Sequence, residues 1–265
     1  MYEHTAQTML CRVIMKHFFI LFLLYLLSTT LFASGKFYVV SNQSSILENV
    51  KNDKVIVTQL VTKQTYDCNT NIYSINNNTN DCIISFTGDI IVKLNEKSKL
   101  NLDTFEQKIE NINDLPSIAK VSTSNFTVSL FGSAQFFVNN TFTEDKPFIV
   151  ATPLANILIK SGKIIIKSDE KSVLLIVLEG ETTVFDTLSK RTQKVNDKNM
   201  LVIVPAPKLQ GKAAEHMRKQ NMFSLKTLDD TEFNELNLDL ITLKETQSNI
   251  KFIVVNQDIV GVKIR

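Results

Sequence analysis

Two neighbouring stretches decide the fold of this chain: FIVATPLANILIKSGKIIIK at positions 148–167 and VLLIVLEGETTVFD at positions 173–186. Both consist of short runs of β-branched and other apolar residues, interrupted by Thr-Pro or by a single glycine. Short apolar runs bounded by turn residues are typical of strands that bury at least one face. These stretches therefore predict a ladder of strands.

Short apolar runs of the same kind also occur upstream of these two stretches. Lys54–Val61, Cys82–Phe86 and Asp89–Leu94 are further β-branched or aromatic runs. The sequence NFTVSLF at 125–131 alternates apolar and polar residues, and the alternation resumes at 134–138. We therefore predict that strands dominate the chain from its first third to Val204.

Glycines separate several of these expected strands. A corner of the chain favours glycine because a Cβ atom would strain the backbone there. The spacing between the glycines is unequal, so the sequence has no strict short repeat. The prediction is a mainly β fold, an irregular β-solenoid or flattened two-sheet stack of short strands, with corners at Gly88, Gly132, Gly162 and Gly180.

The first 35 residues have the parts of a secretory signal. Lys16 precedes an apolar run from Phe18 to Leu27, and small residues follow. We expect cleavage between Gly35 and Lys36, because Ala33 and Gly35 then occupy the positions three and one before the cut. Residues 1–14 lack these features, which is consistent with a start codon assigned too early. The protein is expected in the periplasm or outside a bacterial cell.

An uncleaved membrane anchor is the alternative interpretation of this segment. The apolar stretch from Phe18 to Phe32 is shorter than the roughly 20 residues that cross a bilayer, so we favour cleavage. Contact with a membrane is expected only if the segment stays attached.

Cys68 and Cys82 are the two cysteines that remain after cleavage. An even pair in an exported protein suggests a disulfide, which here would close a hairpin-like loop and add roughly 3 kcal/mol of stability. A metal site is a poor alternative, because no further Cys or His lies nearby to complete four ligands. We predict a disulfide and no metal or other cofactor.

The strand pattern ends at Pro205-Ala206-Pro207, because the two prolines have no backbone N–H to donate to a strand ladder. A helix is expected over 212–222. A second is expected from an N-cap at Asp229, with Glu232 completing a capping box and Leu228 and Phe233 a hydrophobic staple, and ending near Leu238. Strands are expected at 240–243, 251–255 and 259–264.

These boundaries divide the chain into a signal at 1–35, a β domain at 36–205 and a small α+β appendage at 206–265. The appendage, a helix plus a β-hairpin, has too small a core for independence, so we expect it to pack on the β domain.

Catalysis is not expected of this chain. Glu179, Glu181 and Asp186 are the carboxylates that a polysaccharide-cleaving solenoid would use, near Lys163 and Lys167. Their alternation with apolar or turn residues is more typical of exposed strand positions. The lone mature histidine, His216, is expected on a solvated helix face. The loop Asn76–Asn80 is expected to be a solvated turn, with presentation of its amides to a glycan as the alternative.

The central segment resembles the FecR domain. The resemblance is carried by Thr152-Pro153 between two strands, the corner at Gly162, and Val177-Leu178-Glu179-Gly180 before a strand that ends at Asp186. It extends over 37–205, and includes Gly88-Asp89 and the turn at 95–98. Family members often have Gly-Thr where this chain has Gly162-Lys163.

The resemblance implies a β-solenoid or flattened two-sheet stack in an exported protein. FecR regulators in the narrow sense also have a cytoplasmic region with tryptophans, whereas this chain has no Trp. We therefore expect a non-catalytic FecR-like module that binds an envelope protein or polysaccharide. A membrane-tethered regulator and a carbohydrate-active solenoid enzyme are the alternatives. A net charge of +2 without a basic run makes nucleic acid an unexpected partner.

Overall fold

The structure of the chain is a computed structural model. The described residues begin at Gly35, so the rest of the expected signal lies outside them. Residues 212–220 of the expected helix with His216, the expected strand at 240–243, and Gly88 also lie outside the described residues, whereas Met222, the expected last residue of that helix, begins a strand instead. The described residues are 35–51, 54–68, 73–87, 89–110, 117–118, 120–139, 142, 145–205, 221–236, 250–255 and 258–264.

Strands make up most of the described chain, and one short helix covers 230–236, so the prediction of a mainly β fold is confirmed. The strands are β1 (Gly35–Ser41), β2 (Ile46–Lys51), β3 (Lys54–Gln59), β4 (Thr65–Cys68), β5 (Tyr73–Asn77), β6 (Cys82–Thr87), β7 (Ile90–Leu94), β8 (Ser98–Glu110), β9 (Ser117–Ile118), β10 (Lys120–Val138), β11 (Phe148–Ala151), β12 (Ala155–Ser168), β13 (Val173–Asp186), β14 (Thr192–Val195), β15 (Asn199–Val204), β16 (Met222–Thr227), β17 (Ile250–Val255) and β18 (Asp258–Ile264).

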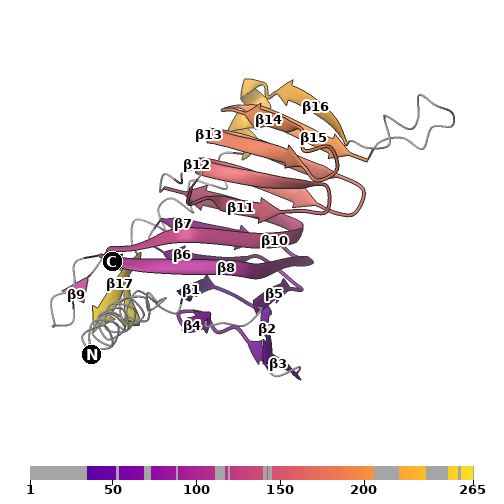
Figure 1. Ribbon diagram of the computed structural model, residues 1–265. Helices are drawn as coiled ribbons and strands as arrows, with labels where there is room; N and C mark the ends of the chain where they lie inside the picture. The colour runs from indigo at the N-terminus through magenta and orange to yellow at the C-terminus, as the bar shows by residue number, and fades with distance from the viewer. Residues whose placement is uncertain are drawn as a thin grey trace, which may run out of the picture. The chain divides into compact units, whose positions relative to one another are not determined.

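Fifteen of these strands form one hydrogen-bonded sheet that is folded into two layers (Figure 1). One layer runs in the order β16-β15-β13-β12-β10-β7-β6-β1-β4, and the other in the order β14-β13-β12-β11-β10-β8-β5-β2-β3. The long strands β10, β12 and β13 belong to both layers. Each layer is thus held to the other by the backbone itself as well as by the core.

The long strands pass from one layer to the other at glycines. In β12 and β13, Gly162 and Gly180 lie directly opposite each other, with φ values of 124° and 98°. A Cβ atom on Gly162 would overlap the carbonyl oxygen of Glu179. Gly132 in β10 has the same left-handed backbone, at φ 98°. The three glycines therefore occupy corners as expected, but the strands continue through these corners, where the sequence suggested separate strands.

Phenylalanines dominate the core between the layers. Phe126 stacks on Phe148 with ring centroids 4.8 Å apart, and Phe86 lies 4.8 Å from Phe126. Aliphatic residues of both layers surround these rings, and each buried side chain contributes on the order of 2 kcal/mol. The fully buried members include Phe37, Ile75, Ile84, Phe86, Ile90, Leu94, Leu100, Phe126, Phe136 and Phe148.

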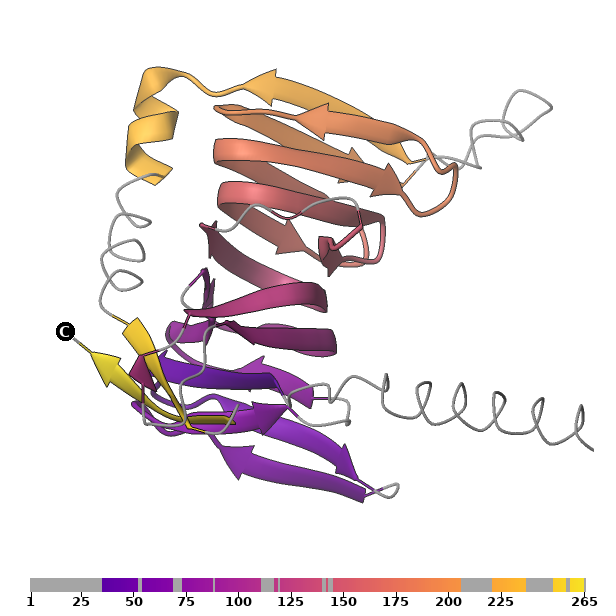
Figure 2. The same cartoon turned by 60° about the vertical axis from the view of Figure 1, so that its left-hand side comes forward.

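Residues 228–236 and the β17–β18 hairpin, the described parts of the C-terminal segment, cover the outer side of the β13-β12-β10-β7-β6-β1 layer (Figure 2). This side carries an apolar stripe, which we call the covered face: Tyr38, Ile91, Phe137, Ile165, Ile176 and Leu178. Leu228, Phe233, Leu236, Ile250 and Val262 pack against it. The tail thus buries a second hydrophobic cluster outside the main core.

The start of the short helix matches its sequence signature. The Asp229 carboxylate accepts hydrogen bonds from the backbone N–H groups of Thr231 (3.0 Å) and Glu232 (2.9 Å), and the Glu232 carboxylate accepts one from the Asp229 N–H (3.2 Å). This reciprocal pattern is a capping box. The strands β17 and β18 form the expected hairpin, and β9 joins them in a separate three-stranded sheet.

The predicted disulfide is not formed, because Cys68 and Cys82 are free thiols in the structure. Their strands, β4 and β6, pair with opposite edges of β1. Cys68 lies opposite Gly35, whereas Ile83, the neighbour of Cys82, lies opposite Ser41, about 20 Å further along. A disulfide requires Cα atoms within about 7 Å. The prediction was wrong because a strand distant in sequence inserts between the two cysteines.

Candidate functional site

The outer side of the second layer forms a sheet face that no described element packs over. We call it the open face and define it by the outward side chains of β8, β10, β11, β12 and β13. Phe131 and Phe185 are 48% and 38% exposed there. Its exposed and half-exposed members are Asn101, Asp103, Thr127, Ser129, Phe131, Ile149, Ala151, Asn156, Thr183 and Phe185, and Leu158 lies on the same side but is only 7% exposed.

Strand register brings residues from five strands into one row on the open face. Asn101 lies opposite Ser129, Ser129 opposite Ala151, Ala151 opposite Asn156, and Asn156 opposite Phe185. The row therefore runs from amide and hydroxyl groups to an aromatic ring. A sheet face that combines polar groups with an aromatic ring can contact a partner across several strands.

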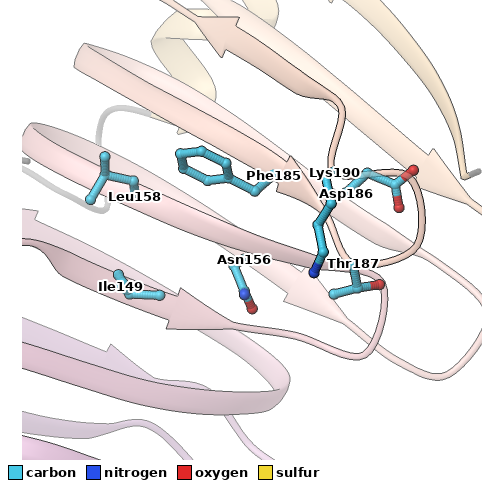
Figure 3. A pocket seen from close by; sticks show the side chains of 7 residues that line it. All are labelled: Ile149, Asn156, Leu158, Phe185, Asp186, Thr187 and Lys190. Carbon is cyan, nitrogen blue, oxygen red and sulfur yellow. The ribbon is translucent and has the colours of Figure 1, made fainter.

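A shallow depression of about 350 Å³ lies at the aromatic end of this row (Figure 3). Ile149, Leu158 and Phe185 supply its apolar part, and Asn156 and Lys190 supply polar groups. Figure 3 shows the Lys190 side chain directed toward Asn156 and Thr187. The depression thus combines an apolar surface with a cation and an amide, which can hold an apolar side chain beside a polar or acidic group.

Asp186 supports this depression from beneath and has a structural role. It is 1% exposed, and its carboxylate accepts hydrogen bonds from the Asn221 N–H (3.0 Å), the Asn221 side-chain amide (2.7 Å) and the Leu188 N–H (3.0 Å). Burial acts to raise the pKa of Asp186, but hydrogen bonds from Ser189, Leu188 and Asn221 outweigh it and lower the pKa. In Figure 3 the carboxylate points away from Asn156.

A second shallow hollow, of about 240 Å³, lies at the other end of the row, between Asn101, Ser129, Phe131 and Pro153. The Ser129 hydroxyl donates a hydrogen bond to the Asp103 carboxylate at 2.6 Å. Here too an exposed aromatic ring stands beside hydroxyl and amide groups.

Thr152 and Pro153, which carry part of the FecR resemblance, form the turn between β11 and β12. The Thr152 hydroxyl accepts a hydrogen bond from the Ala155 N–H (3.1 Å) and donates one to the Ala155 carbonyl (2.6 Å). Pro153 is exposed, and its missing N–H is not needed by a strand ladder. Both residues therefore shape one rim of the open face.

The other carboxylates considered for catalysis are held in ion pairs at the glycine corner. Glu179 pairs with Lys163 at 2.9 Å, and Glu181 pairs with Lys160 at 3.0 Å and Lys194 at 3.8 Å. A side-chain hydrogen bond from Lys160 and its charge lower the pKa of Glu181. The described structure does not bring these two groups together with the buried Asp186.

Asn77 corrects the expectation of a solvated Asn-rich turn at 76–80. It is 1% exposed, and its side-chain amide donates to the carbonyl oxygens of Leu94 and Asn95, each at 2.8 Å, while its oxygen accepts from the Ser45 hydroxyl at 2.9 Å. Asn77 thus joins three backbone segments. Its neighbours 78–80 are exposed.

Cys68 and Cys82 are poorly suited to reactions. Desolvation, with the nearby Asp67 charge, raises the pKa of Cys68 well above its ordinary value. Burial raises the pKa of Cys82 to about 11, although a hydrogen bond with Ser45 opposes it. Both thiols stay protonated at neutral pH. Within the described residues, no cluster of three or more potential metal ligands occurs.

Sequence reasoning did not single out Phe131, Phe185 and Lys190. The alternation around Phe131 and Phe185 was visible, but it does not indicate which sheet face remains uncovered. Lys190 has a positive φ of 60°, a conformation that only the tight turn after β13 imposes.

Comparisons with known proteins show limited similarity. No protein-family model matches the chain, and no curated protein does. Two crystal structures, at 2.50 and 1.65 Å resolution, of a protein from Parabacteroides distasonis ATCC 8503 provisionally assigned as an anti-sigma factor align with a TM-score of 0.41 and 17% identity. The alignments cover 62% of this chain, and the chain spans 63% and 64% of those chains. In the described part of the chain, no helix has the length and apolarity needed to cross a membrane.

Proposed function

We propose that this chain is an exported, non-catalytic FecR-like module that binds a protein or cell-surface polymer of the bacterial envelope through its open face. The observation that carries the proposal is the contrast in exposure between the two outer sheet faces. One is buried under the C-terminal segment, whereas the other presents Phe131 and Phe185 to solvent. Exposed aromatic rings beside amides and hydroxyls are typical of binding surfaces.

The polar groups around the two rings support recognition of a partner of mixed polarity. Asn156 and Lys190 stand beside Phe185, while Asn101 and Ser129 stand beside Phe131. The two depressions lie at opposite ends of one row of strand residues, so an elongated partner can contact both. A rigid strand scaffold holds the groups at fixed spacing.

The positions of the acidic residues support binding more than hydrolysis. Glycosidases place two carboxylates within about 5–10 Å across a bound sugar. Here Glu179 and Glu181 are held by lysines, and Asp186 is buried beneath the face.

An affinity experiment with matched variants tests the proposal. The full chain, immobilised, is exposed to a native envelope extract and, separately, to an array of envelope glycans. We expect Phe185→Ala and Phe131→Ala to weaken retention by about tenfold or more, since aromatic anchors carry much of a binding energy. Leu225→Ala, at an exposed site on β16 outside the open face, should not affect it.

Retention that survives both aromatic substitutions would contradict the assignment of the open face. Release of product from an envelope polysaccharide, abolished by Glu179→Gln, would contradict the non-catalytic role. Export is tested separately by sequencing the N-terminus of the released protein, which should begin at Lys36, next to the first residue of β1.

A further inference from the structure

Within the described chain, β3 lies at an edge of the 15-stranded sheet and lacks the features that usually prevent an edge strand from pairing with another chain. Its only strand neighbour within the described chain is β2. All six of its residues are exposed, and Val55, Ile56 and Val57 retain 62%, 48% and 57% of their accessible surface. The strand therefore presents apolar side chains on both sides and an open backbone edge between them. Exposed edges of this kind recruit another strand.

The other strands at the edges of the same sheet, β4, β14 and β16, have features that prevent pairing with another chain. β4 and β14 have only four residues each, and Asp67 and Lys194 lie within them. β16 carries Lys226, which pairs with Glu232 of the following helix at 2.7 Å. Short length and charged side chains are the devices that prevent edge pairing. In β3 the only charge is Lys54, at its first position.

The sequence of β3 is complementary to itself in an antiparallel pairing. Val57 is opposite Glu48 and Val55 is opposite Val50, so the two valines share one side of the sheet, and Ile56 lies on the other. A two-fold axis normal to the sheet keeps each side continuous between copies. In the register centred on Ile56, each Val55 lies opposite the second copy's Val57, and each Ile56 lies opposite the same residue of the second copy.

Charge also favours this register. Lys54 lies opposite Thr58 of the other copy, so the two Lys54 residues are four positions, or about 13 Å, apart along the strands. That distance exceeds the screening length of roughly 8–10 Å in physiological salt. A parallel in-register pairing would instead place the two ammonium groups on neighbouring strands.

We propose that two copies of this chain associate through antiparallel β3–β3 pairing centred on Ile56, which joins their sheets into one. The interface lies on β3, separate from the depressions of the open face, so the pairing presents two open faces on one assembly. Such an arrangement increases the avidity for a repetitive partner.

Sedimentation of the full chain over a concentration series tests the pairing. We expect twice the chain mass for the unmodified protein. Ile56→Lys should raise the dissociation constant by about tenfold or more, because it places like charges opposite each other. Leu225→Lys, the matched change on the β16 edge, should leave the dimer intact. Circular dichroism identifies any variant that has failed to fold.

Cross-linking provides a second measurement. Residues opposite each other across an antiparallel pair have Cβ atoms about 5 Å apart, so Ile56→Cys should form an intermolecular disulfide on mild oxidation. Val61→Cys, equally exposed but outside β3, should not.

A single-chain mass at every concentration would overturn the proposal. A dimer unaffected by Ile56→Lys, or larger species dispersed by Leu225→Lys, would also overturn it, the latter by showing head-to-tail pairing of β3 with β16.

Discussion

The covered face and the open face are built largely from the same strands, yet one is buried and the other is exposed to solvent. Ile165 and Ile176 on the covered face are buried beneath Leu228 and the C-terminal hairpin. On the open face, Phe185 remains exposed beside Asn156. The difference shows that an apolar stripe on the outside of a sheet does not by itself indicate a binding surface. What matters is whether the chain supplies its own cover.

A substitution at the corner of β12 and β13 should destabilise the fold that carries both faces. Gly162→Ala is expected to lower the free energy of unfolding by about 4 kcal/mol or more, because the new Cβ overlaps the Glu179 carbonyl and the positive φ disfavours it. Chemical denaturation measures the loss. The adjacent Ser161→Ala should cost less than about 1 kcal/mol. Equal effects would show that the corner tolerates a side chain.

The same isoleucine-to-alanine change should cost much more stability on the covered face than on the open face. Ile176→Ala on the covered face is expected to destabilise by about 2–4 kcal/mol, since it leaves a cavity under the tail. Ile149→Ala on the open face should cost roughly 1 kcal/mol or less, because water already reaches that side chain. Urea unfolding of both variants measures this. Equal losses would mean that both faces are covered in solution.

Asp186 provides a smaller test, at the base of the open face. Asp186→Asn should cost about 1–3 kcal/mol at neutral pH, because an amide cannot accept all the hydrogen bonds of the buried carboxylate. Its lowered pKa means that the ionised carboxylate stabilises the fold above the unfolded pKa of about 3.9, and that this contribution is lost as the pH falls through the folded pKa.

Unfolding measured from neutral pH downward should therefore show wild type and Asp186→Asn converging in acid. Asp103→Asn, at an exposed position of the open face, is the control and should change stability by less than about 0.5 kcal/mol throughout. A gap between wild type and Asp186→Asn that stays constant with pH would contradict the assigned role of the charge.

Local features of the fold could be predicted from the sequence. The alternation around Phe126, the glycines at the corners and the capping box at Asp229 and Glu232 each depend on neighbouring residues, so their signals survive without knowledge of distant contacts. The β17–β18 hairpin was predicted for the same reason.

The failures concern pairings between distant segments. Nothing near Cys68 or Cys82 reveals that β1 lies between their strands. Asp186 was recognised as a residue of interest, but its partner Asn221 is 35 positions away. The candidate site could be predicted only in part, because periodicity gives two sides to each strand and does not determine which side the tail will bury.

The facing glycines Gly162 and Gly180 also have a consequence for folding accuracy. A slip of one residue between β12 and β13 would place a residue with a side chain against a backbone that accepts none. Because both strands run through both layers, the same slip would move core-facing side chains to the solvent side in each layer. The corner therefore fixes the alignment of β12 with β13: a register error made in either layer is rejected at the glycine pair where these two strands pass from one layer to the other.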